Sequence, residues 1–184
     1  RRAGYRTAAF GKLHLNTYKG CDNDTSMESI TRWDTGILDD WYGPYYGFSL
    51  VEMTSCHGEG GGGRYIRWRD RHFPGLQLGP EHASPGPSCP ALGCWKSNMP
   101  VEAHHSTWVA DRAIDFLDNV GQQPFYLHVS FPDPHHPFSP PAPYHSMYDD
   151  VEFDQPHAIS SENDTKPEPW RRAMTGRPFP TDGD

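Results

Sequence analysis

The sequence is poor in the side chains that usually build a protein core. Leu, Ile, Val and Phe make up only 29 of its 184 residues. A content this low accompanies disorder when the net charge is high. Here the net charge is only −8 and aromatic residues reach 13%. With 18 Gly and 19 Pro, the composition therefore favours a folded chain that is rich in loops.

Two further features are missing, and each excludes a class of partner or location. The chain has no excess of basic residues, with 16 Lys and Arg against 24 Asp and Glu. This acidic balance disfavours nucleic acid, whose phosphates select basic surfaces. No apolar run approaches the ~18 residues that a membrane span requires. We expect neither a nucleic-acid partner nor a membrane span.

Common site motifs and an N-terminal leader are also missing. The chain starts at Arg1 with no apolar stretch behind it, so we expect an internal piece of a longer protein. The glycine run 60–63 lacks the Lys-Ser/Thr of a phosphate loop and is interpreted as a flexible surface loop. The four cysteines lack zinc-finger spacing, which leaves free thiols or a local Cys89–Cys94 disulfide as alternatives.

The pattern of apolar residues predicts an α/β fold. Residues 7–15 indicate a short strand, and 107–120 a helix that leads into an apolar run at 125–131. That run is bounded by prolines and is typical of a buried parallel strand. Helix followed by strand is half of a βαβ crossover. We expect residues 16–106 to be mostly irregular, apart from a short strand near 48–53, and the chain after 149 to be loop.

The helix over 107–120 has signals at both ends. Ser106 is a suitable N-cap, and Gly121 stands where a left-handed residue ends many helices. The helical spacing of four residues predicts one apolar face, made by Ala110, Ala113, Ile114 and Leu117.

Two places could carry chemistry. In an extended strand Lys12 and His14 would project together, and an ammonium beside an imidazole suits an oxyanion such as sulfate or phosphate. The second place is the stiff loop 133–137, Asp-Pro-His-His-Pro, which follows the apolar run at the end where α/β sheets bind ligands. The alternatives are a solvated lysine with a histidine bonded to a carbonyl, and a loop whose histidines cap neighbours. The other histidine pairs, including His104-His105 and Cys56-His57, are weaker candidates, because 11 histidines make chance neighbours common.

These same segments resemble the type I sulfatases. Residues 4–15 contain GYRT and GKLHL, similar to a signature of that family written G-Y-x-T…G-K-W-H-L-G. The segment 125–148, FYLHVSFPDPHHPFSPPAPYHSMY, is similar to the strand and P-H-x-P loop of the family. The resemblance covers roughly residues 4–150, with GPYYGF and Val51-Glu52 between the two motifs.

The resemblance implies an alkaline-phosphatase-like α/β sandwich, a large mixed sheet with helices on both faces. Family members hydrolyse sulfate esters with a formylglycine, made from Cys or Ser in C/S-x-P-x-R, beside a bound calcium ion. It also implies that Lys12 contacts sulfate, that His14 supports the formylglycine, and that His135 contacts sulfate or assists the leaving group. The implied substrate is a sulfated small molecule or glycan, in a periplasmic, secreted or lysosomal setting.

The sequence departs from the family pattern at several points. Leu13 and Asn16 replace the usual Trp and Gly, and no C/S-x-P-x-R occurs in the 184 residues. The paired acidic calcium ligands cannot be placed, so no metal ligand is assigned. We therefore expect residues 1–150 to be part of a sulfatase catalytic domain and 151–184 to be a truncated acidic, Pro-rich loop or linker. The chain alone should be inactive; a phosphoester or phosphonate hydrolase and a non-catalytic secreted binding module are the alternatives.

Overall fold

The computed structural model describes residues 3–17, 26–55, 57–84, 93–154 and 165–174. The chain divides into two compact units, residues 1–149 and 150–184. The first unit holds the sheet, and the second holds the short helix α4 (Glu168–Met174) in a segment that was expected to be loop. Whether the first unit is a part of a larger domain stays a prediction.

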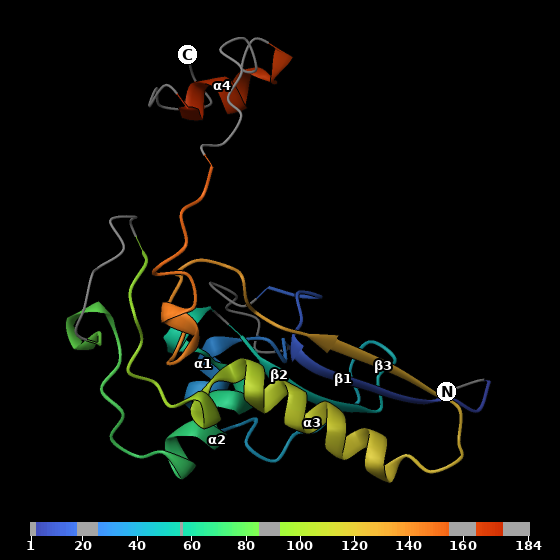
Figure 1. The fold of residues 1–184 in the computed structure, drawn as a ribbon. Helices are drawn as coiled ribbons and strands as arrows, with labels where there is room; N and C mark the ends of the chain where they lie inside the picture. Colours follow the sequence, from blue (N-terminus) through green and yellow to red (C-terminus); the bar gives the residue numbers. More distant parts are fainter. Residues whose placement is uncertain (1–2, 18–25, 56, 85–92, 155–164, 175–184) are drawn as a thin grey trace. The chain divides into compact units, whose positions relative to one another are not determined.

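The first unit is built on three parallel strands. They are β1 (Arg6–Lys12), β2 (Leu50–Thr54) and β3 (Phe125–Ser130), in the order β2-β1-β3 (Figure 1). A parallel sheet requires crossover connections, and helices lie in them. The predicted α/β class is therefore confirmed. The first strand is shorter than predicted, since it ends at Lys12 and not at Leu15.

Two α-helices lie within the region that was expected to be mostly irregular. They are α1 (Ile30–Asp34) and α2 (Gly63–His72), and the helix at the predicted position is α3 (His105–Asn119). Single 3-10 turns lie at Gly58–Gly60, Pro80–His82, Val101–Ala103 and Tyr144–Ser146. Most of the described residues of 16–106 lie outside helices and strands, as expected, but the helix α2 was not foreseen, and tertiary contacts stabilise it. Tyr65 is fully buried in it, and the Arg64 guanidinium lies 3.6 Å from the centre of the Tyr42 ring.

Both faces of the central strand are covered. Alternate residues of a strand point to opposite faces, so β1 contributes to two cores. Ala8 and Phe10 pack with Trp108 and Phe116 of α3, while Ala9 packs with a second cluster around α1 and β2. This second cluster contains Leu13, Trp33, Leu38, Val51 and Met53. The middle strand is therefore the best-buried part of the sheet.

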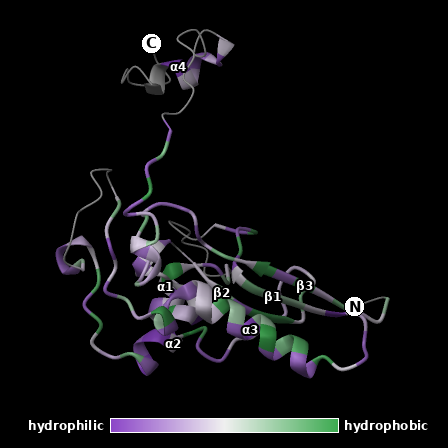
Figure 2. Cartoon of the chain, in the orientation of Figure 1, coloured by the Kyte–Doolittle hydropathy of each residue, from purple (hydrophilic) through white to green (hydrophobic). Residues whose placement is uncertain are grey.

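Helix α3 buries a face that shares only Ala113 with the predicted one. Figure 2 shows hydrophobic and hydrophilic residues alternating around it. The buried side chains include Trp108, Val109 and Phe116, whereas Ile114 and Leu117 are 54% and 46% exposed. The large rings interlock with β1, because the Phe116 ring lies edge-on to Phe10 at 5.9 Å between centroids.

The ends of α3 agree with the prediction at one end only. Gly121 follows the helix with a φ of +69°, the left-handed conformation that favours glycine. At the other end the N-cap is His104 and not Ser106, since the His104 Nδ1 accepts a hydrogen bond from the Ser106 N–H at 3.2 Å. The helix thus begins earlier than expected.

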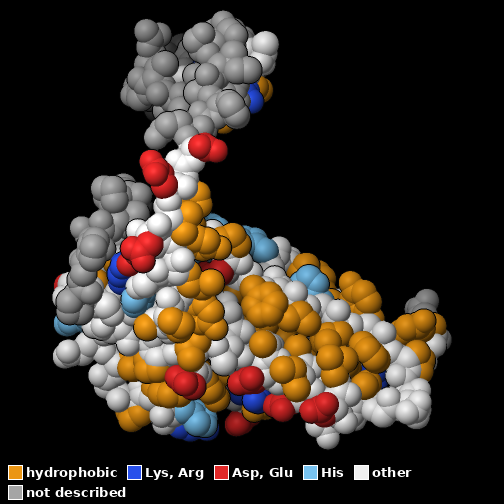
Figure 3. Space-filling view, viewed as in Figure 1, with side chains coloured by type: hydrophobic (Ala, Val, Ile, Leu, Met, Phe, Trp, Pro, Cys, Tyr) orange, Lys and Arg blue, Asp and Glu red, His pale blue; other side chains and the backbone are white. Residues whose placement is uncertain are grey.

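Strand β3 is parallel, as predicted, but it is not buried. It pairs with β1 on one side and is the outer strand among those the structure describes. Phe125 and Tyr126 are exposed, and the rest of the strand is half-buried. Figure 3 shows hydrophobic side chains spread over α3 and β3 on this face. The helices in the described residues are all too short or too polar to cross a membrane.

The glycine run is not a flexible surface loop. Gly63 is buried, begins α2 and has a φ of +65°. A Cβ at Gly63 would lie 2.6 Å from the carbonyl oxygen of Met53, and one at Gly62 would lie 2.3 Å from the Ser55 hydroxyl. Glycine is required at 62 and 63 because the backbone there passes too close to the end of β2 to leave room for a Cβ. Of the cysteines, Cys21, Cys56 and Cys89 lie outside the described residues, so the pairing proposed for Cys89 stays untested.

Candidate active site

The candidate site is formed where the three parallel strands end. Lys12 is the last residue of β1, His57 follows the end of β2, and His135 follows the end of β3. Because the strands are parallel, their carboxyl ends meet at one edge of the sheet, where α/β proteins bind ligands. Three segments that are distant in sequence therefore supply side chains to one place.

The contacts at this edge are direct. The Lys12 Nζ contacts the His57 Nε2, and the His57 ring stacks on the His135 ring with 3.5 Å between centroids and 6° between planes. The His136 ring lies beside His135, at 4.4 Å between centroids. We call Lys12, His57 and His135 the oxyanion cluster. His57 was missed from the sequence, where Cys56-His57 looked like a chance pair.

The electrostatics of the cluster keep His57 neutral at neutral pH. Burial, the positive charge of Lys12 and the neighbouring histidines, including His14, together lower the pKa of His57 to about 4. A neutral His57 can accept a hydrogen bond from the Lys12 ammonium at Nε2 and present its other ring nitrogen as a donor. An anion placed here would meet one ammonium and several imidazoles.

His14 lies just outside the strand, in the exposed turn that follows it. Since β1 ends at Lys12, the strict alternation that was expected to align Lys12 with His14 does not extend to His14. The side chain is still near enough to His57 for its charge to affect the pKa of that imidazole. His14 therefore lies at the border of the oxyanion cluster.

A buried carboxylate holds the turn that carries His14. Glu28 is 2% exposed, and its Oε1 accepts hydrogen bonds from the backbone N–H of Leu15 at 2.8 Å and of Asn16 at 3.0 Å. The Tyr45 hydroxyl donates to the same oxygen at 3.0 Å. Burial and this carboxylate raise the pKa of Tyr45, so the hydroxyl keeps its proton. Nothing in the sequence around Glu28 indicated this role.

A glycine allows the loops of His57 and His135 to approach each other. Gly58 has a φ of +57°, and a Cβ on it would lie 2.7 Å from the Pro137 Cγ. Any larger residue would therefore separate the two loops that carry the stacked imidazoles. The loop of His135 is also held by the segment around Gly93, because the Gly93 carbonyl oxygen accepts a hydrogen bond from the Phe138 N–H at 2.7 Å.

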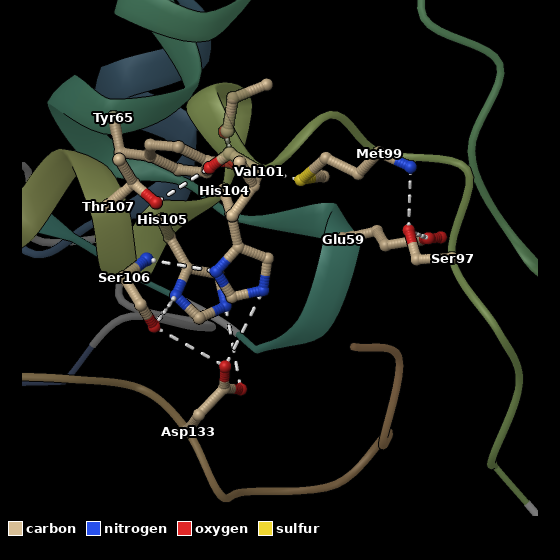
Figure 4. A network of polar contacts seen from close by, with 11 residues as sticks. Glu59, Tyr65, Ser97, Met99, Val101, His104, His105, Ser106, Thr107 and Asp133 are labelled. Atoms are coloured by element: carbon tan, nitrogen blue, oxygen red, sulfur yellow. Dashed lines mark hydrogen bonds and ion pairs between the residues drawn. The ribbon is translucent and has the colours of Figure 1, made fainter. Parts of the chain in front are cut away.

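A second group of polar side chains lies at the start of α3 (Figure 4). The Nε2 atoms of His104 and His105 each lie 3.6 Å from a carboxylate oxygen of Asp133. Among the described residues this is the one set of three or more His, Cys, Asp or Glu side chains that could share a metal ion. Calcium prefers an all-oxygen set of six to eight ligands. Two imidazoles and one carboxylate do not fit it, so no step is assigned to calcium here.

Comparison with known proteins gives one consistent result. The family model described as Sulfatase matches residues 1–166, beyond residue 150, where the resemblance was expected to end. The chain is 41% identical to an arylsulfatase of Clostridium perfringens, over 84% of the chain and 30% of that protein. It is 28% identical to the uncharacterized sulfatase YidJ of Escherichia coli, over 99% of the chain and 31% of that protein.

A further relative carries a broader name. The chain is 37% identical over 83 residues to the multifunctional alkaline phosphatase superfamily protein PehA of Trinickia caryophylli. This match covers 45% of the chain and 15% of that protein. The chain thus spans about a third or less of the length of the curated relatives it matches.

Proposed function

The chain belongs to the sulfatase family, and from this premise we propose that it is part of a sulfuric ester hydrolase and supplies part of the sulfate pocket. The observation that carries the proposal is the oxyanion cluster at the ends of three parallel strands. Lys12 and His57 are in direct contact, and His57 stacks on His135. The similarity to an arylsulfatase supports the same chemistry.

The residues of the cluster suit a tetrahedral oxyanion. An ammonium and imidazole N–H groups donate to sulfate oxygens and stabilise the charge that develops on them during transfer. We assign sulfate contacts to Lys12 and His135, as the family resemblance implied, and add His57, which the structure brings between them. An imidazole next to the leaving oxygen can also deliver a proton to it, and this is the second role we give His135.

Two features of sulfatase catalysis have no counterpart in these residues. The motif C/S-x-P-x-R, which provides the formylglycine nucleophile, does not occur in the sequence. The His104–His105–Asp133 set does not fit calcium. We therefore propose that this polypeptide binds sulfate but does not turn over sulfate esters by itself. The role of His14, support of the nucleophile, is proposed on the resemblance and on its place beside His57.

Binding and turnover are tested separately. Titration calorimetry with inorganic sulfate should show binding that weakens at least tenfold in Lys12→Ala and in His135→Ala. His145→Ala is the matched control, because His145 belongs to another loop and contacts Ser146. Unchanged binding in both cluster variants would remove the basis of the proposal. Hydrolysis of an aryl sulfate by the chain alone, lost in His135→Ala, would refute the proposed inactivity.

A phosphoester or phosphonate hydrolase is the second candidate function. The similarity to the multifunctional protein PehA favours it, and an ammonium with imidazoles also suits phosphate. Parallel assays of sulfate, phosphate and phosphonate esters on the intact enzyme would separate the two. A larger kcat/KM for sulfate esters supports the first proposal, and a larger value for the phosphorus esters supports the second. In the first case the natural ligand is a sulfated small molecule or a glycan.

A further inference from the structure

The group at the start of α3 contains none of the residues assigned to sulfate, although His57 is near enough to affect the pKa of His105. It consists of His104, His105 and Asp133, and we call it the helix-start cluster (Figure 4). Asp133 belongs to the loop that carries His135, while the two histidines belong to the N-terminal end of α3. The donor atoms of the three side chains all lie within 4.8 Å of one another.

The strongest observation in this cluster is an unpartnered nitrogen. The His105 side chain is 1% exposed, and its Nε2 is buried without a hydrogen-bond partner in the described part of the chain. This atom faces Asp133, at 3.6 Å from Oδ1, which is too long for a hydrogen bond. Buried polar atoms without a partner are rare in folded proteins and require an explanation such as an absent water or ion.

The spacing matches what one metal ion would need. Nitrogen and oxygen donors bind tetrahedral zinc at about 2.1 Å, which places two such donors roughly 3.4 Å apart. The His104 Nε2 lies 3.6 Å from the Asp133 Oδ2, and the His105 Nε2 lies 3.6 Å from the Asp133 Oδ1. The donors are close enough to share an ion, and they are too far apart to satisfy each other directly.

The chemistry of the donors selects the metal. Two imidazoles and one carboxylate are a common ligand set for Zn²⁺, which leaves the fourth position of a tetrahedron open. Burial lowers the pKa of His105 to about 3 and also lowers the pKa of His104, so both are neutral at physiological pH. The neutral imidazole is the form that binds metals. A cavity of about 440 Å³, lined in part by His104, Ser106 and Asp133, gives an ion access from solvent.

We propose that His104, His105 and Asp133 bind a zinc ion that fastens the loop of His135 to the start of α3. The site is separate from the proposed sulfate chemistry and from the calcium that the sulfatase family implies. Its effect would be structural, because the ion joins the start of α3 to the loop that carries His135 and so helps to position that histidine. Asp133 is two residues before His135 in the same loop.

Zinc binding requires one rearrangement, and this supplies a specific signature. Without metal the His104 Nδ1 accepts from the Ser106 N–H, which places the proton on Nε2. Zinc at Nε2 moves that proton to Nδ1, and the Ser106 N–H loses its acceptor. An N-cap hydrogen bond raises the folding equilibrium constant by a factor of roughly 2 to 30. Zinc binding in zinc-finger peptides favours the folded state by a factor of roughly 10⁷ or more. A much weaker zinc site would therefore still outweigh the loss of the N-cap hydrogen bond.

Zinc titration of the chelator-treated protein tests the proposal. We expect one equivalent of Zn²⁺ by calorimetry, no competition from excess Ca²⁺, and faster hydrogen exchange at the Ser106 amide after binding. Asp133→Asn should weaken zinc binding at least tenfold; it is the preferred variant because Asp133 is exposed and the change keeps its shape. His72→Ala, in a different helix, should leave zinc affinity unchanged.

The oxyanion cluster also contains histidines, so one variant must distinguish the two places. His57→Ala should leave zinc binding intact. Loss of zinc binding in His57→Ala with retention in Asp133→Asn would place the metal on the oxyanion cluster and overturn the proposal. Absence of stoichiometric zinc binding by the wild-type protein would overturn it as well. Replacement of zinc by Co²⁺ gives a visible absorption band, and its loss in Asp133→Asn would support direct ligation by that carboxylate.

Discussion

Sulfate binding to the oxyanion cluster should depend on pH through His57. In the absence of an anion the pKa of His57 is about 4, because burial and the charge of Lys12 disfavour the imidazolium. A bound sulfate places negative charge beside the ring and favours the imidazolium, so it raises this pKa. Linkage then requires sulfate affinity to rise as pH falls from the pKa of the complex towards that of the free protein.

The size of the effect follows from the two pKa values. We take the pKa of the complex as the ordinary histidine value of about 6.5. The affinity ratio between pH 5 and pH 7.5 is then about 30, or roughly 2 kcal/mol. Sulfate remains a dianion across this range, so the ligand itself contributes no pH dependence. Lys12 supplies a fixed charge and should affect affinity equally at both values.

Titration calorimetry at pH 5 and pH 7.5 measures the ratio directly. His57→Gln keeps a polar side chain of similar size but cannot be protonated, so its ratio should be at least tenfold smaller than that of the wild type. A wild-type ratio below about threefold, or an equal ratio in His57→Gln, would refute the reasoning.

Three further predictions concern the scaffold of the site, each measured by urea unfolding. Gly11→Ala should destabilise the protein by about 3 kcal/mol or more, because φ is +98° and the new Cβ would lie 1.9 Å from a carbonyl oxygen of β3. Gly4→Ala, with open space around it, should cost only about 1 kcal/mol; equal losses would contradict the close approach. Phe116→Ala should cost about 3–5 kcal/mol and the half-exposed Leu117→Ala less than about 1, and the reverse order would mean that the buried face of α3 is wrongly assigned. Glu28→Ala should cost about 1–3 kcal/mol and speed amide exchange in the turn after β1, because the N–H groups of Leu15 and Asn16 lose their acceptor; unchanged exchange would show that this carboxylate does not hold the turn.

The helix at 105–119 shows which features hydrophobic periodicity can predict and which it cannot. Its position, and the left-handed glycine behind it, could be predicted from local spacing and backbone preference. Its buried face could not, because two stripes with helical spacing run along it. The stripe with Ile114 and Leu117 lies towards solvent, and the one with Trp108 and Phe116 packs on β1. The choice depends on which rings fit against Phe10, and that is a tertiary property.

Helix α2 shows the opposite case, an element that local sequence hides. It begins with glycine, a poor helix former, and four of its ten residues are arginine, so its sequence is strongly polar. The contacts that stabilise α2 are made with residues distant in the sequence. Tyr65 donates from its buried hydroxyl to the Ala103 carbonyl oxygen at 2.8 Å, and Arg64 donates to the Trp41 carbonyl oxygen at 2.5 Å. Neither partner can be inferred without the fold.

The sequence by itself determined the family, the α/β class and two of the chain segments that form the candidate site. Short motifs carry that information because Lys12 and His135 each stand beside characteristic neighbours along the chain. Only the tertiary structure decided that His57 lies between them, that Glu28 fastens the turn of His14, and that His105 faces Asp133 with an unpartnered nitrogen. The physical reason is that parallel strands bring the segments after their carboxyl ends to one edge, whatever their separation in sequence.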